Sequence, residues 1–261
     1  MRRGRWAALL LVCLAVLAGT TTDTEPGTEP SGRSGTTKLL RVPHLLEVWR
    51  PPDLLGEGWR VLPPKSPAGE AVRAQGGLWR LDVPHDAGGE LRTVPGSEPA
   101  PREAERVVTV RVAVERGLAV NGTEFARQVM DTLNDPRGWG HDGSVVFART
   151  DGEADIDITL ASPATTDELC APVDTAGRVS CGRVGYAVLN AQRWAHGAEP
   201  FLEAGGTVAD YRHYLVNHEV GHVLGHPHVR CPAPGALAPV MVQQTLGLDG
   251  CRPNGWPAAS G

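Results

Sequence analysis

Five of the nine histidines in this 261-residue chain fall between residues 213 and 228, in a segment that reads HEVGHVLGHPH from residue 218. On a helix, His218 and His222 are four residues apart, so both imidazoles leave one face and can reach one ion. Glu219 is offset by one residue, too far round the helix to be a natural third ligand. It can still reach a water on that ion as a general base.

A third ligand must come from the chain after this helix. Gly225 tolerates a positive φ, so the chain can turn sharply there and bring His228 back toward the other two rings. His226, next to the glycine, is a further candidate. A bare H-E-x-x-H also arises by chance, but the added glycine and third histidine favour the open arrangement of catalytic zinc, three protein ligands and a water. We therefore predict one catalytic Zn²⁺.

Strands and helices that could position this cluster begin near residue 105. Valines alternate from 107 to 114, as in a strand, and apolar residues four apart predict a helix over 123–133. The helix over 207–224 has Thr207 and Asp210 at capping-box spacing and Gly225 as its stop. Three more short apolar runs read as strands: Val145–Arg149, Ile156–Leu160 and Tyr186–Leu189. This order predicts an α/β or α+β layer domain with one sheet.

The N-terminal residues have the pattern of an export signal. Arginines at positions 2, 3 and 5 precede an uncharged apolar run from Trp6 to Gly19, which is shorter than a membrane-spanning helix requires. We predict a cleaved signal peptide at 1–20, with an uncleaved anchor as the alternative. A flexible linker at 21–37, a Pro-rich and partly ordered extension at 38–104 and a domain at 105–258 follow. This organisation predicts a secreted or envelope-associated protein.

Of the five cysteines, Cys13 lies in the predicted signal peptide. Export makes the other four informative, because an oxidising compartment disfavours free thiols. Four cysteines allow three pairings. We expect the sequence-local one, Cys170–Cys181 and Cys231–Cys251.

Charge and hydropathy exclude some partners. The formal net charge is -5, with no basic excess for binding nucleic acid. No apolar run after the signal is long enough to cross a membrane. We therefore expect no nucleic-acid partner and no transmembrane segment after the signal, and we expect a monomer.

The complete pattern H-E-x-x-H-x-x-G-x-x-H resembles the metzincin zinc peptidases. These also place a methionine in a tight turn under the metal, and this chain has Pro239-Val240-Met241 downstream. The resemblance implies a zincin-like, metzincin-type α+β domain with a mixed sheet and an active-site helix that carries HExxH. It favours His228 over His226 as the third ligand and assigns the Met-turn to Met241. Gln243 stands where some metzincins have a tyrosine, and only about twenty residues follow Met241.

A narrower resemblance, over about residues 76–258, is to DUF3152, a family of secreted actinobacterial proteins of unknown function. It is carried by Tyr211-Arg212-His213-Tyr214-Leu215-Val216-Asn217, by Arg230-Cys231-Pro232, by the segments 135–139, 190–194 and 238–245, and by Cys251-Arg252-Pro253-Asn254-Gly255-Trp256-Pro257. This resemblance implies a zincin-like fold and leaves the activity open.

Other residues have simpler interpretations. We expect His213 to be a surface or hydrogen-bonding residue, and Asn121 to mark a turn before a helix. We expect structural hydrogen bonds from Arg137 and Arg193, and packing roles for Trp139, Trp194 and Trp256. Residues 185–190 are interpreted, by analogy with zincins, as an edge strand that pairs with extended substrate.

The function that fits these features is a secreted zinc-dependent endopeptidase with Glu219 as the general base. Two alternatives stay open: a non-catalytic, zinc-stabilised envelope or binding module, and an amidase of cell-wall peptide. The intact Glu219 favours hydrolysis, because a purely structural metal site does not need it.

Overall fold

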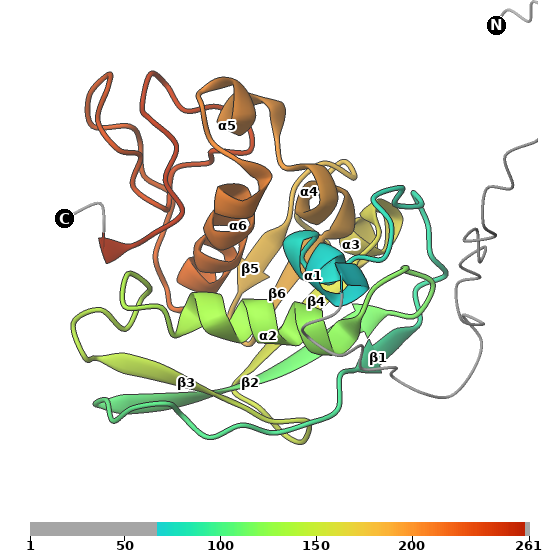
Figure 1. The fold of residues 1–261 in the computed structure, drawn as a ribbon. Helices are drawn as coiled ribbons and strands as arrows, with labels where there is room; N and C mark the ends of the chain where they lie inside the picture. Colours follow the sequence, from blue (N-terminus) through green and yellow to red (C-terminus); the bar gives the residue numbers. More distant parts are fainter. Residues whose placement is uncertain (1–66, 259–261) are drawn as a thin grey trace, which may run out of the picture. The chain divides into compact units, whose positions relative to one another are not determined.

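The computed structural model describes residues 67–258. The predicted signal peptide, the linker and residues 38–66 of the predicted extension lie outside the described residues. Within the described part, no helix is both long and apolar enough to cross a membrane. In chain order (Figure 1), the elements are α1 (Pro67–Ala74), β1 (Leu91–Thr93), β2 (Arg106–Glu115), α2 (Gly122–Leu133), β3 (Val145–Arg149), β4 (Ile156–Ala161), α3 (Pro163–Cys170), β5 (Cys181–Arg183), β6 (Tyr186–Asn190), α4 (Ala191–His196), α5 (Glu199–Glu203) and α6 (Val208–Val223).

The alternating valines form β2, the strand around which a mixed sheet is built. The first half of β2 pairs with β3 and the second half with β4, both in parallel. β4 pairs in parallel with β6, while β1 and β5 are antiparallel to their neighbours. The sheet order is β1-β2-β4-β6-β5, with β3 beside β2. The prediction of an α+β domain with one mixed sheet is therefore confirmed.

The interpretation of residues 185–190 as an edge strand is wrong. β6 lies inside the sheet, between β4 and β5, and the three-residue strand β5 forms the edge. The chain turns back between the two strands at Gly185, whose φ of 88° lies in the left-handed region. A strand of only three residues, one of them glycine, has no alternating pattern by which it could be recognised.

The two faces of the sheet carry different helices. α2 and α6 contact each other on one face, and the main hydrophobic core lies between them and the sheet (Figure 1). Along β6, Ala187 and Leu189 point into this core, whereas Val188 belongs to a second cluster with α3. α2 buries the predicted apolar face, Phe125, Val129 and Leu133.

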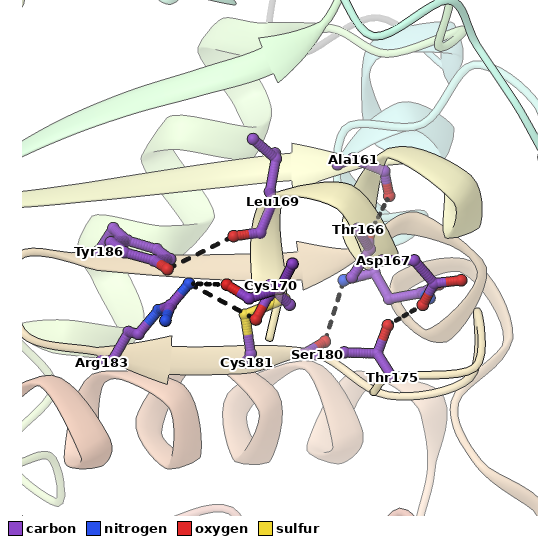
Figure 2. The surroundings of a disulfide bond; sticks show 12 residues. Ala161, Thr166, Asp167, Leu169, Cys170, Thr175, Ser180, Cys181, Arg183 and Tyr186 are labelled. Carbon is purple, nitrogen blue, oxygen red and sulfur yellow. Dashed lines mark hydrogen bonds between the residues drawn. A yellow bond between two sulfur atoms is a disulfide. The ribbon is translucent and has the colours of Figure 1, made fainter. Parts of the chain in front are cut away.

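The two predicted disulfides are confirmed. Cys170–Cys181 joins the end of α3 to the start of β5 (Figure 2), with Cα atoms 6.0 Å apart. Beside it, Arg183 donates to the carbonyl of Ala171 at 2.6 Å. Cys231–Cys251 encloses the segment that contains Met241, with Cα atoms 5.8 Å apart. Each bond closes a short loop and contributes about 2–4 kcal/mol to stability.

The described part of the predicted extension packs against the rest of the domain. Leu78 and Val94 belong to the main core. The carbonyl of Gly76 accepts a 2.8 Å hydrogen bond from the indole nitrogen of Trp194, and that of Ala74 accepts one from Arg212 on α6. Residues well before 105 are thus tied to the helix that carries the histidines.

Helix α6 begins as predicted and passes very close to the sheet edge. Thr207 and Asp210 form a reciprocal capping box at its start. Farther along, the helix meets β5 at Gly182, where a Cβ atom would lie only 2.0 Å from the carbonyl oxygen of Glu219. The absence of a side chain at position 182 therefore sets the distance between the edge strand and the helix.

We expect Gly182→Ala to destabilise the fold, because the added methyl group must push β5 away from α6. Overpacking of this kind costs about 1–3 kcal/mol, measurable as a lower Tm in thermal unfolding. Gly247→Ala is the matched control, since a Cβ atom there meets no atom within 4 Å. Equal Tm values for the two variants would contradict the close approach of strand and helix.

Candidate metal site

Three histidine side chains converge at the C-terminal end of α6. His218 and His222 lie on the helix and His228 follows it. Their ligand atoms all lie within 4.8 Å of one another. Nε2 of His222 and Nε2 of His228 are 2.9 Å apart, close to the ~3.3 Å between two nitrogens bound to one tetrahedral zinc. The donor set therefore fits a divalent ion that prefers imidazole.

Backbone carbonyls orient the two helical rings. Nδ1 of His218 lies 2.8 Å from the carbonyl oxygen of Val240, and Nδ1 of His222 lies 3.0 Å from that of His226. A carbonyl can only accept, so each Nδ1 must carry the proton and donate it. Each Nε2 then keeps the lone pair that a metal ligand needs.

Desolvation favours the neutral form of all three imidazoles. His218 is only 4% exposed, and desolvation lowers its pKa to about 3. Desolvation also lowers the pKa values of His222 and His228 below the ordinary 6.5. Because only a neutral imidazole can bind a cation, these shifts reduce competition from protons.

The turn after α6 selects His228 over His226. The amide of Gly225 donates to the backbone carbonyl of His222, and the amide of His226 donates to the backbone carbonyl of Gly221. Together these bonds form a Schellman motif around Gly225, whose φ is 95°. The His226 ring stacks on the indole of Trp139, with centroids 4.2 Å apart. His226 therefore lies outside the group of side chains that could share one ion, whereas His228 belongs to that group.

Met241 lies against the helix between the two helical histidines. It is buried, and a Cβ atom at Gly221 would lie 2.4 Å from its sulfur. Its carbonyl accepts a hydrogen bond from the amide of Val229, the residue after His228. The segment with Met241 thus supports both the helix and the loop that carries the third histidine.

Glu219 is a carboxylic acid that is buried on α6. Its side chain is 4% exposed, and burial raises the pKa of its carboxyl group to about 8. It does not belong to the group of side chains that could share one ion. A buried carboxyl group next in sequence to a candidate metal ligand is a feature of functional sites rather than of ordinary cores.

The other residues singled out from the sequence have structural contacts. His213 contacts the hydroxyl of Thr132 at 3.0 Å. Arg193 donates to backbone carbonyls, and Arg137 pairs with Asp135 and covers the ring of Trp256.

Asn121 caps α2 by accepting a hydrogen bond from the backbone amide of Glu124, as expected for a turn before a helix. Trp194 is fully buried in the core.

Sequence reasoning missed the supporting shell of the cluster. The indole nitrogen of Trp139 donates to the carbonyl of Asn217 at 2.8 Å, and the Asn217 amide donates to Gly255. The hydroxyl of Tyr214 donates to the carbonyl of Val242. The sequence could have indicated Tyr214 and Asn217 only by their position, because both stand just before His218.

A family model described as "Protein of unknown function (DUF3152)" matches residues 80–254. No curated protein and no solved structure matches the chain.

We expect His228→Ala to weaken Zn²⁺ binding by more than about 100-fold, which exceeds the usual effect of losing a residue that only orients a ligand. The fold should survive, because the His228 side chain is exposed. Competition with a chromophoric chelator measures the affinity, and circular dichroism checks the fold. His196→Ala, also exposed, is the control. Unchanged affinity in His228→Ala would remove His228 from the site.

We expect His213 to make stability depend on pH. Desolvation, and secondarily Arg137, lowers its pKa below 6.5, while Asp210 and Asp135 partly oppose the shift. The unfolded chain therefore binds the proton more tightly. The stability contribution is complete above about pH 6.5 and is lost as the pH falls toward the folded-state pKa.

The test compares His213→Gln, which does not titrate, with the wild type. Between about pH 7 and about pH 5, the Tm of the wild type should fall more steeply than that of the variant. Parallel Tm profiles would show that His213 does not contribute.

Proposed function

The chain belongs to the DUF3152 family, and we propose that it is a secreted zinc-dependent peptidase that hydrolyses peptide bonds with Glu219 as the general base. The observation that carries this proposal is the convergence of His218, His222 and His228, together with a buried carboxyl group on Glu219, the residue after the first of them. Three imidazoles that leave a further position open are typical of catalytic rather than structural zinc. The metzincin-type pattern of the sequence supports the same proposal, with a zincin-like fold.

The three histidines would hold the ion through ring nitrogens. Val240 and His226 support this role, because their carbonyls keep the helical rings in the tautomer that leaves Nε2 free. When bound, zinc would polarise the scissile carbonyl and lower the pKa of a water. Met241 would lie beneath the site as packing and not as a ligand.

Glu219 would move the proton. As a carboxylate, one of its side-chain oxygens accepts a proton from the attacking water and later gives it to the nitrogen of the leaving amine. Its position suits this role, because it lies on the same helix as two ligands but outside the ligand group.

The raised pKa of Glu219 links its ionisation to the ion. Burial alone favours the protonated form near neutral pH, since the pKa is raised to about 8. A cation on the neighbouring imidazoles would oppose this shift, because a nearby opposite charge favours the carboxylate. The carboxylate form that acts as the base would therefore be more populated when the site is loaded.

The covalent structure supports an extracellular location. Two disulfides are consistent with an extracellular protein, as is the export pattern of the first residues. We place the activity outside the cell, on proteins or peptides. A cell-wall peptide would be cleaved by the same chemistry, and fluorogenic peptides and peptidoglycan fragments tested side by side distinguish the two substrates.

We expect Glu219→Gln to keep Zn²⁺ affinity near the wild-type value while hydrolysis falls by roughly 10²–10⁴-fold, the range for a positioned general base. Glutamine keeps the size of the side chain but cannot accept the proton. Rates on a fluorogenic peptide library and chelator competition measure the two effects. Glu203→Gln, exposed on α5, is the matched control.

Three outcomes would contradict this proposal. Loss of the metal in Glu219→Gln would make Glu219 a ligand. Full activity in the same variant would exclude it as the base. A wild type that binds Zn²⁺ and cleaves neither peptides nor peptidoglycan fragments would favour a non-catalytic, zinc-stabilised binding module.

A further inference from the structure

We infer that the stack of His226 on Trp139 positions the second metal ligand, so that both are positioning residues for His222. This inference rests on the metal site of the proposed function but not on the hydrolytic step. It concerns a residue that the sequence offered as an alternative ligand and that the structure places elsewhere.

The loop after α6 is exposed, yet it contributes two groups to the candidate site. Residues 225–230 are all exposed. The loop nevertheless supplies the carbonyl of His226, which lies 3.0 Å from Nδ1 of His222, and the ring of His228. Any displacement of the loop changes the orientation of one ligand and the position of another.

Trp139 provides a firm surface for this loop. It lies between α2 and β3, far from the loop in sequence. Its indole nitrogen donates to the carbonyl of Asn217 at 2.8 Å, and its ring packs so closely on α6 that a Cβ atom at Gly221 would lie 2.6 Å away. Trp139 is therefore fixed to the helix that carries His222.

The His226 ring completes the connection. It lies nearly parallel to the indole, with 14° between the planes and 4.2 Å between the centroids. Because ring and carbonyl belong to one residue, stacking of the ring limits the positions open to the carbonyl that orients His222. Aromatic pairs in offset-stacked geometry are favourable, and partners that orient a ligand usually affect metal affinity by 10–100-fold.

The test separates stacking from ligation. His226→Ala removes the ring and keeps the backbone carbonyl, whereas His226→Phe keeps a ring that can stack and cannot bind metal. His141→Ala, exposed in the same loop as Trp139, is the control. The full chain is titrated with Zn²⁺ against a chromophoric chelator, and Co²⁺ absorption reports the geometry of the site.

We expect His226→Ala to bind Zn²⁺ about 10-fold more weakly, at the low end of the effects of residues that orient a ligand. We also expect it to change the Co²⁺ spectrum. His226→Phe should restore both readouts to near wild type. Trp139→Leu should weaken binding at least as much, and circular dichroism must show that it is folded. The rescue by phenylalanine is the readout that a general loss of stability would not produce.

Unchanged affinity in His226→Ala would overturn the inference. So would equal losses in His226→Ala and His226→Phe, which would make the imidazole itself a ligand. A wild type without Zn²⁺ affinity would overturn both this inference and the proposed function. If the His226 variants behave as expected while Glu219→Gln hydrolyses normally, the hydrolytic mechanism falls and the positioning role stands.

Discussion

The hydrogen bond between Nδ1 of His218 and the carbonyl of Val240 is the interaction on which the candidate site depends. It joins the buried helix α6 to the segment that carries Met241 and sets which nitrogen of the first ring faces the cluster. The segment is itself held from several directions. The Cys231–Cys251 disulfide encloses it, and the Gln244 side chain exchanges two hydrogen bonds with the backbone of Asn254.

Two glycines give α6 its close neighbours. Gly182 lets the edge strand approach Glu219, and Gly221 makes room for both Met241 and Trp139. In the sequence, Gly221 looks like a weak point inside a helix, since glycine lowers helix stability by about 1 kcal/mol. The packing explains its presence, because a larger side chain would displace the groups that surround the two helical histidines.

The parts of the fold that follow one periodicity could be predicted from the sequence. The valines of β2, the apolar face of α2 and the capping box of α6 are local patterns, and the structure shows each of them. His218 and His222 were also accessible, because side-chain identity and helical spacing bring them to one face of α6, whereas the choice of His228 over His226 came from the metzincin resemblance. By contrast, β5 is too short for a pattern, and its place at the sheet edge depends on non-local pairing.

The support of the cluster was hidden for a different reason. Val240 and His226 act through backbone carbonyls, which every residue has, so residue type does not reveal them. Trp139 approaches α6 from a loop about eighty residues earlier in the chain. The stacked ring of His226 was visible only as a histidine near a metal motif, and spacing alone could not distinguish a ligand from a neighbour of a ligand.

The unequal exposure of the three histidines has a kinetic consequence. His218 is almost fully buried, while His228 lies on an exposed loop. An ion would therefore arrive and leave on the side of His228, and a chelator in solution could take it by displacing the outer ligand first. Exchange by this path needs movement of a few loop residues only, so the rate of metal loss would follow the opening of the loop and not the unfolding of the domain.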